Sequence, residues 1–300
     1  IAKLRLWLSI VVDQEIDEEN QEPHPLPNLD CNIMVGNSLI DEYEGIKLFD
    51  ETILFRERNG QNGNQMPEEK QELQLSLLID HTDELLKEMF ELQDRYFAED
   101  NEDSKSNLKR KIDHIRDSLI RYKLRRDGNS EGLKRYEESL KNKTKPYFIW
   151  ELEFARVFKE KGGFDIVIGN PPYIDSENMV RSGLEQDRNI IAGKYRFTKG
   201  NWDIYIAFFE LGFSILSPLG NLIYITPDKW ISKPFGDEIR KNLFDNIYSL
   251  LNAGRDIFES ARVDAIVTQF SKKISDDIRI YDYSNHTIIY KRTIKKVILS

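Results

Sequence analysis

Four consecutive residues, Asn170-Pro171-Pro172-Tyr173, bring together an amide, two proline carbonyls and an aromatic ring. The prolines stiffen φ and remove two backbone N–H donors, but both carbonyls remain acceptors. The Asn170 side-chain oxygen and the Pro171 carbonyl could each accept one hydrogen from an exocyclic NH2 group, and Tyr173 could stack on a base for roughly 1–3 kcal/mol. This pattern favours chemistry on the amine of a nucleobase flipped out of a duplex. A proline turn with an asparagine cap is the alternative interpretation.

The element that must position this motif is the apolar run 164–169, which directly precedes Asn170. Its length and β-branched residues predict a buried, central strand. Open α/β sheets place their ligand crevice at the carboxyl ends of such strands. A helix is expected before this strand at 150–158, and a polar, irregular loop at 174–195 that could close over a flipped base. The chain should continue with a helix at 202–216, a strand at 222–226, a helix at 237–244, a strand at 263–270, and a hairpin of 278–283 with 287–290.

The first part of the chain is expected to hold a helix at 1–12, a short strand at 32–35 ending at Gly36, an apolar run at 46–58 and a linker at 59–65. From about residue 67 to 145, Glu, Lys, Arg, Leu and Asp dominate. Helical spacing predicts a pair of antiparallel helices here. The second, at 106–126, should bury Leu108, Ile112, Ile115, Leu119 and Ile120. Its basic residues indicate either a clamp around DNA or a solvated helix face; these are Lys109, Arg110, Lys111, Arg116, Arg121, Lys123, Arg125 and Arg126.

Composition sets limits on function. The chain has 300 residues, 40% hydrophobic and 32% charged, with a formal net charge of −9. This charge argues against indiscriminate coating of nucleic acid, but local basic strips can still contact phosphates; the candidates are Lys194, Arg196, Lys199, Lys229 and Lys233. A single cysteine, Cys31, excludes an internal disulfide. The four histidines lack metal-ligand spacing, and no segment has the length of a membrane span. We therefore expect no metal, no membrane association and a cytoplasmic protein.

Several further segments resemble those of a known family, and they follow one another along the chain in the same order as in that family. With the Asn170–Tyr173 motif, they resemble the S-adenosylmethionine-dependent N6-adenine DNA methyltransferases of the gamma arrangement. The resemblance is strongest to the modification part of type IIG restriction-modification enzymes and related phage-defence methyltransferases. The segments that carry it are 4–9, 26–30, 36–39, 148–150, 199–205, 220–227, Phe258 and 262–267.

The resemblance implies an α/β fold: a Rossmann-like methyltransferase sheet, truncated at its N-terminus and interrupted by a helical insertion. The implied domains are a partial cofactor-side half at 1–60, a helical hairpin insertion at 61–147, a catalytic half at 148–275, and the start of a following domain or a terminal hairpin at 276–300. Asn170, Pro171, Pro172 and Tyr173 would form the catalytic corner. The implied substrate contacts are Phe258 and Lys199, and the implied cofactor contacts are Gly36, Asn37 and Ser38.

The implied activity is methylation of adenine N6 in double-stranded DNA from S-adenosylmethionine, with the target adenine flipped out. Cytosine N4, RNA guanine and protein glutamine also present an amine to this motif. A non-catalytic DNA-binding or assembly module with the same fold is a second class of function. The family's glycine-rich cofactor loop is expected before Arg5 and is not found, so we expect a fragment of a longer protein. A target-recognition domain would then follow Ser300, and a linked nuclease would precede Ile1.

Overall fold

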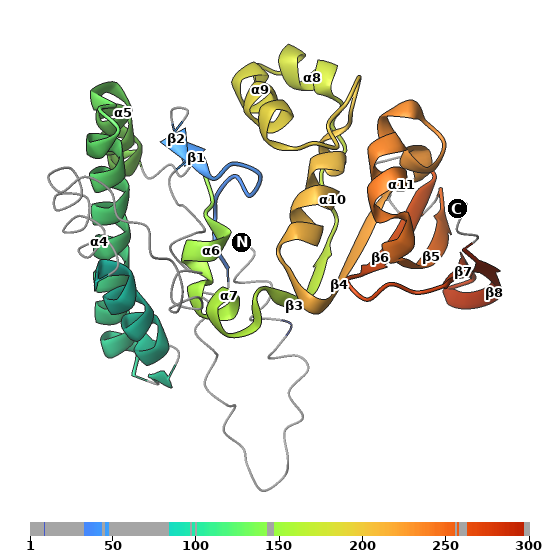
Figure 1. The fold of residues 1–300 in the computed structure, drawn as a ribbon, viewed down its shortest axis with the longest axis horizontal. Coiled ribbons are helices and arrows are strands. Elements are labelled where there is room, and N and C mark those ends of the chain that lie inside the picture. Colours follow the sequence, from blue (N-terminus) through green and yellow to red (C-terminus); the bar gives the residue numbers. More distant parts are fainter. Residues whose placement is uncertain are drawn as a thin grey trace, which may run out of the picture. The chain divides into compact units, whose positions relative to one another are not determined.

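The computed structural model describes residues 9, 33–43, 46–47, 84–96, 98–99, 101–142, 147–255, 257 and 263–296 (Figure 1). Of the expected helix at 1–12 only Ser9 is described, and it is helical. The linker at 59–65, Phe258 and most of the 46–58 run lie outside the described residues. The chain forms two compact units, Ile1–Asn37 with Lys70–Phe148, and Ser38–Glu69 with Ile149–Ser300. We call them the helical unit and the sheet unit; the residue ranges of the four expected domains remain predictions.

The sheet unit is built on a mixed six-stranded sheet in the order β3-β4-β6-β5-β7-β8. β3 is parallel to β4, β5 is parallel to β7, and the other pairs are antiparallel. The expected α/β class is therefore confirmed. The strands are β3 Phe164–Gly169, β4 Leu216–Pro227, β5 Ile247–Gly254, β6 Ala265–Ser271, β7 Asp277–Ser284 and β8 Thr287–Lys295, with a separate pair of β1 Glu42–Tyr43 and β2 Ile46–Lys47.

β3 is not the buried, central strand that its composition predicted. It lies at one edge of the described sheet and pairs with β4 alone. The side chains of Ile166 and Ile168 are 65% and 76% exposed. An apolar run predicts an extended segment, but it does not determine how many strands or helices cover that segment.

The helices of the sheet unit correct two further expectations. The expected helix at 150–158 is split into α6 and α7, because Phe154 leaves helical geometry at φ −120° and ψ 38°. The expected irregular loop at 174–195 instead holds α8 and α9. Asp175 caps α8 by accepting from the backbone N–H groups of Glu177 and Asn178 at 3.1 and 2.8 Å. The helices are α6 Trp150–Glu153, α7 Ala155–Lys161, α8 Ser176–Arg181, α9 Glu185–Lys194, α10 Ile204–Ser214 and α11 Asp237–Leu243, with 3-10 turns at 228–231, 234–236 and 244–246.

The core of the sheet unit is aromatic and lies between α10 and the sheet. The buried ring of Phe209 on α10 lies 5.6 Å from that of Trp230 and 5.4 Å from that of Phe270 on β6. Gly212 lets α10 approach β4, since a Cβ there would stand 2.6 Å from the Tyr224 hydroxyl. This packing sets α10 against β4, whose end lies beside the Asn170 motif, and against β6.

The helical unit contains helical residues 84–96, then α4 Glu102–Arg126 and α5 Ser130–Lys141. α4 begins earlier than the expected 106, because the Asn101 side chain accepts from the Ser104 N–H at 3.0 Å and caps the helix. All five residues expected on its inner face are buried. α5 was not expected. The sequence does contain a signal for its start, because Gly128 has a left-handed φ and is followed by Asn129, which caps the helix. The described residues of the expected strand at 32–35 form no strand, and Val35 is exposed.

The predicted terminal hairpin is confirmed as the antiparallel pair β7 and β8, in which Ser284 lies opposite Thr287 next to the turn. Its turn, Asn285-His286, has φ of +49° and +58°. Two consecutive positive φ values define the tight turn that best matches strand twist, and asparagine tolerates them well.

Candidate functional site

The Asn170–Tyr173 segment follows β3 at the same edge of the sheet where its parallel neighbour β4 ends. The Tyr173 hydroxyl lies 2.8 Å from the Asn170 Oδ1 and 3.3 Å from the Ile225 carbonyl of β4. Its single proton can serve either acceptor. Tyr173 therefore ties the Asn170 amide to the end of β4, and the four residues form one corner.

Of the two groups that could hold an amine, the Asn170 amide is open to solvent and the Pro171 carbonyl belongs to a buried residue. Asn170 and Pro172 are exposed, Tyr173 is half-buried and Pro171 is buried. Among the residues that the structure describes, no hydrogen bond reaches the Pro171 carbonyl. The Asn170 oxygen has a second lone pair besides the one that faces Tyr173. Two neutral acceptors thus stand next to each other at a strand end.

A second segment, 202–204, holds the chain just after the corner. The Ile174 N–H donates to the Asp203 Oδ1 at 3.0 Å, and the Ile204 N–H donates to the Ile174 carbonyl at 2.9 Å. The Ser176 N–H also donates to the Trp202 carbonyl at 2.8 Å. Asp203 lies in the segment 199–205 that carries the family resemblance, but its contact with Ile174 was not predicted. An aspartate directly before an apolar helix was the available signal.

The electrostatics of the corner depend on burial. Burial raises the pKa of Asp203 to about 6, while the backbone N–H groups of Ile174 and Tyr205 oppose the rise. Burial, followed by the charge of Asp203, raises the pKa of Tyr173 above its ordinary value. The phenol therefore stays protonated at neutral pH and can keep donating toward Asn170.

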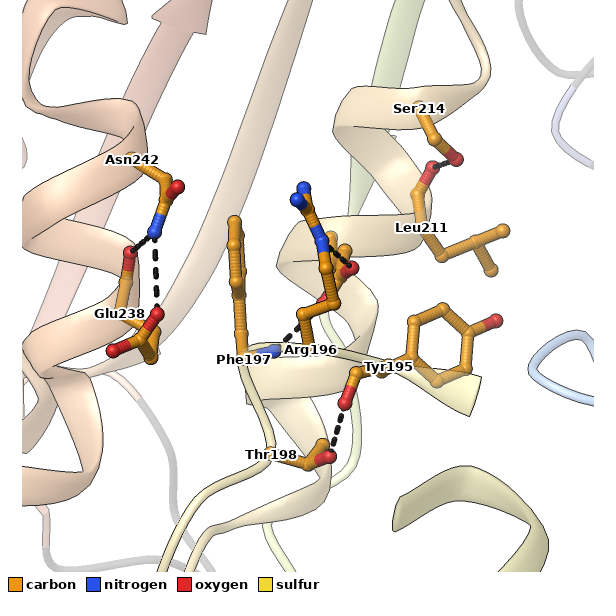
Figure 2. A network of polar contacts seen from close by, with 9 residues as sticks. Tyr195, Arg196, Phe197, Thr198, Leu211, Ser214, Glu238 and Asn242 are labelled. Atoms are coloured by element: carbon orange, nitrogen blue, oxygen red, sulfur yellow. Dashed lines mark hydrogen bonds and ion pairs between the residues drawn. The ribbon is translucent and has the colours of Figure 1, made fainter. Parts of the chain in front are cut away.

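The segment 195–198, which directly precedes Lys199, is held by polar contacts of its own residues (Figure 2). Glu210 accepts from the Phe197 N–H at 2.9 Å and lies 3.5 Å from the Arg196 Nε. The Thr198 hydroxyl donates to the Tyr195 carbonyl at 2.6 Å and closes the turn. Of the expected basic strip, Lys194 pairs with Asp41 at 2.9 Å and Arg196 with Glu210. Lys199 is exposed and, within the described ranges, has no ion-pair partner.

Comparison with known protein families gives one match over most of the chain. The model of the Eco57I restriction-modification methylases matches residues 1–258. The chain belongs to the Eco57I restriction-modification methylase family.

Individual relatives in this family are much longer than the chain. A Methanocaldococcus jannaschii protein, whose name places it among type II restriction enzymes and methyltransferases, is 25% identical over 325 residues. The match covers 96% of this chain and 26% of that relative, so the chain spans about a quarter of its length. The Escherichia coli type II restriction enzyme and methyltransferase RM.Eco57I is 30% identical over 122 residues, which is 40% of this chain and 12% of that protein.

A likeness to solved structures is weak. The type IIL restriction-modification enzyme MmeI, solved in complex with DNA, aligns with 15% identity and a TM-score of 0.35. The alignment covers 43% of this chain and 18% of MmeI. A score of this size is too low to assign a function.

The residues expected to contact a cofactor in this Eco57I-family chain fall in both units. Gly36 and Asn37 belong to the helical unit, and Ser38 belongs to the sheet unit with Asn170. A Cβ at Gly36 would lie 2.6 Å from the Tyr147 carbonyl, so close packing alone accounts for this glycine. The Ser38 carbonyl accepts from the Trp150 Nε1 at 3.0 Å, and its hydroxyl has no hydrogen bond to another described residue. Phe258, the expected second contact to a base, lies outside the described residues.

The described part of the Eco57I-family chain holds neither a metal cluster nor a membrane-spanning helix. No group of three or more His, Cys, Asp and Glu side chains there is placed to hold a metal ion. None of the helices described is both long enough and apolar enough to span a membrane.

Proposed function

We propose that this chain is the methyl-transferring part of a restriction-modification protein and that it methylates adenine N6 in double-stranded DNA. Membership of the Eco57I restriction-modification methylase family supports the methylation of DNA. The observation that carries the choice of an amine is the exposed Asn170 amide, bonded to Tyr173 beside the Pro171 carbonyl, which accepts no hydrogen bond from any described residue.

Neutral acceptors suit a neutral amine. The lone pair of an exocyclic nitrogen is spread into the base, which makes the nitrogen a weak nucleophile. An acceptor on each N–H hydrogen draws the nitrogen toward tetrahedral geometry and localises the lone pair. Asn170 and Pro171 would accept these two hydrogens, and Tyr173 would hold the Asn170 amide while its ring supports the flipped base. Pro172 would stiffen the corner.

The methyl donor in this proposal is S-adenosylmethionine, which supplies a methyl group on a cationic sulfur, so that the chain need only orient the amine. Of the residues expected to hold it, Asn37 and Ser38 offer side-chain groups that can bond an adenine or a ribose. Gly36 fits this task less well, since its position is explained by packing against Tyr147. Phe258 is proposed to contact the flipped base, and Lys199 a nearby phosphate.

The decisive variant is Asn170→Ala in the intact protein. We expect methylation to fall by at least about 100-fold, because one of two groups that orient the amine is lost. Binding to the same duplex should change less than about threefold. Asn170→Asp, which keeps oxygen acceptors, should retain more activity than the alanine variant. Transfer of labelled methyl groups to duplex DNA measures the rate.

The matched control is Asn178→Ala, an exposed asparagine on α8 whose amide bonds to Asp175. It should leave methylation unchanged. Equal activities of the two alanine variants would reject the role of Asn170. Digestion of the product to nucleosides identifies the modified base, and N4-methylcytosine in place of N6-methyladenine would reject the adenine assignment. An intact protein that binds DNA but transfers no methyl group would indicate a non-catalytic module.

A further inference from the structure

Helix α4 of the helical unit concentrates positive charge in an acidic chain. It carries nine lysines and arginines against four aspartates and glutamates, while the whole chain has a net charge of −9. The described residues 84–96 carry four acidic and two basic side chains, and α5 carries three of each. The positive charge therefore belongs to α4 and not to the unit as a whole.

Part of this charge lies along one exposed face of α4. Residues three or four apart share a helix face, and the exposed residues that do so define what we call the donor face: Asn107, Arg110, Lys111, His114 and Arg125. Arg121 falls on the same face but is ion-paired with Asp117 at 2.8 Å and also with Glu137. Within the described residues, the five donor-face side chains have no ion pair with a carboxylate. Their cations are therefore free to meet an external anion.

The first two turns of the donor face line an open groove of about 380 Å³. Its walls are Glu88, Asn107, Arg110, Lys111, His114 and Ile115. The single carboxylate, Glu88, faces two permanent cations and two further polar side chains. The groove thus has the size and charge to receive an anionic group such as a phosphate.

We infer that the donor face of α4 contacts the phosphate backbone of duplex DNA, an inference that rests on the proposed function. From Asn107 to Arg125 the helix rises about 27 Å at 1.5 Å per residue. This is about eight base-pair steps at 3.4 Å each. A row of hydrogen-bond donors of this length matches one stretch of backbone, and His114 is the only one of the five side chains with a ring on which an unpaired base could stack. The contact is therefore to phosphates and independent of sequence.

The same helix offers a matched control. Lys105, Lys109 and Lys123 lie on another face, are half-buried and also lack an ion-pair partner in the described part of the chain. One triple variant of the intact protein carries Arg110→Gln, Lys111→Gln and Arg125→Gln. The other carries Lys105→Gln, Lys109→Gln and Lys123→Gln. Both remove three positive charges from α4, so a difference between them reports on the face and not on net charge.

The experiment measures binding to a 30-base-pair duplex across a range of salt concentrations. Each lost phosphate contact lowers the slope of log affinity against log salt by about 0.9. In the donor-face triple, the magnitude of this slope should fall by about 2–3. Its affinity at about 0.1 M salt should fall at least tenfold, whether or not the duplex contains a target site. The control triple should stay within about 0.5 of the unaltered slope.

Equal slope changes in the two triples, or no change in the donor-face triple, would overturn the inference. Circular dichroism and the melting temperature check that the helix is intact. Should the donor-face triple unfold, the single variants Lys111→Gln and Arg125→Gln replace it, each with an expected slope change of about 0.9. Methylation by the unaltered protein is measured in parallel. A smaller slope in the donor-face triple, together with no methylation by the unaltered protein, would support the DNA contact and reject the proposed function. Normal methylation by the unaltered protein, together with an unchanged slope in the triple, would reject the DNA contact alone.

Discussion

The sheet unit and the helical unit position their polar groups by different physical means. At the Asn170 corner the groups are neutral, few and held by hydrogen bonds from distant parts of the chain, such as that of Tyr173 with Ile225. On α4 the groups are charged, numerous and placed by helical spacing alone. The difference suits a division of labour in which geometry-sensitive chemistry is built on the sheet, and long-range attraction that tolerates movement is built on a helix.

The interiors of the two units differ in the same way. The sheet unit packs the rings of Phe209, Trp230 and Phe270 against each other. The helical unit buries aliphatic side chains along α4, including Leu124, which has no exposed surface. The Phe209 ring of this core lies against Tyr224 of β4 and Phe270 of β6. The aromatic core therefore supports the strand that ends beside the Asn170 corner.

The largest effect is expected from removing one core side chain in each unit. Phe209→Ala should destabilise the sheet unit by about 3–5 kcal/mol, and Leu124→Ala the helical unit by about 2–5 kcal/mol. Peptide-resolved hydrogen exchange of the intact protein measures both. Phe209→Ala should speed exchange in α10, β4 and β6 and leave α4 unchanged, and Leu124→Ala should do the reverse. If either substitution sped exchange in both units, the two units would unfold together and would not differ in stability.

The next prediction separates the contribution of the Tyr173 ring from that of its hydroxyl. Tyr173→Ala removes the ring and should lower kcat/KM for methylation by about 5–150-fold, the equivalent of roughly 1–3 kcal/mol of stacking. Tyr173→Phe keeps the ring and loses only the hydroxyl, which bonds to Asn170 and to the Ile225 carbonyl, and this should cost about 3–10-fold. Neither variant should alter the salt dependence of DNA binding, because Tyr173 carries no charge. Similar losses in both variants would show that the hydroxyl is the important group and that stacking is not.

Asp203 provides a prediction about pH. Its pKa is raised to about 6, so the folded state favours the protonated carboxyl. That contribution to stability is complete below the ordinary aspartate pKa and is lost as the pH rises through about 6. Compared with Asp203→Asn, the unaltered protein should therefore lose roughly 1–3 kcal/mol between pH 4 and pH 7. Chemical denaturation of both proteins at several pH values measures this difference, and a constant difference would contradict the assigned cause.

The smallest expected effect is the coupling between the two regions. When Asn170→Ala is combined with the donor-face triple, the loss in single-turnover methylation at saturating DNA should equal that of Asn170→Ala alone. The loss in salt dependence should equal that of the donor-face triple alone. The effects of independent sites usually add to within about 0.5 kcal/mol, or a little over twofold. A larger departure would show that α4 also affects how the base is presented to Asn170.

The sequence determined the features that depend on neighbouring residues. Helical spacing on α4 predicted five of the side chains that are buried there, because a period of 3.6 residues sets the face regardless of context. The Asn170–Tyr173 motif was expected after a strand and lies there, because an apolar run before a proline turn leaves few local conformations. The hairpin at Asn285-His286 followed from turn composition in the same way.

Only the tertiary structure decided which segments meet. It placed β3 at an edge of the described sheet, ordered α8 and α9 in a polar stretch, and brought Asp203 to the Ile174 N–H from 29 positions away. It also directed the Tyr173 hydroxyl to both Asn170 and the end of β4. Propensity and periodicity act over a few residues, whereas strand neighbours, burial and hydrogen-bond partners are chosen by how the whole chain packs. The residue types that could bind an amine are therefore visible in the sequence, and the arrangement that holds them is not.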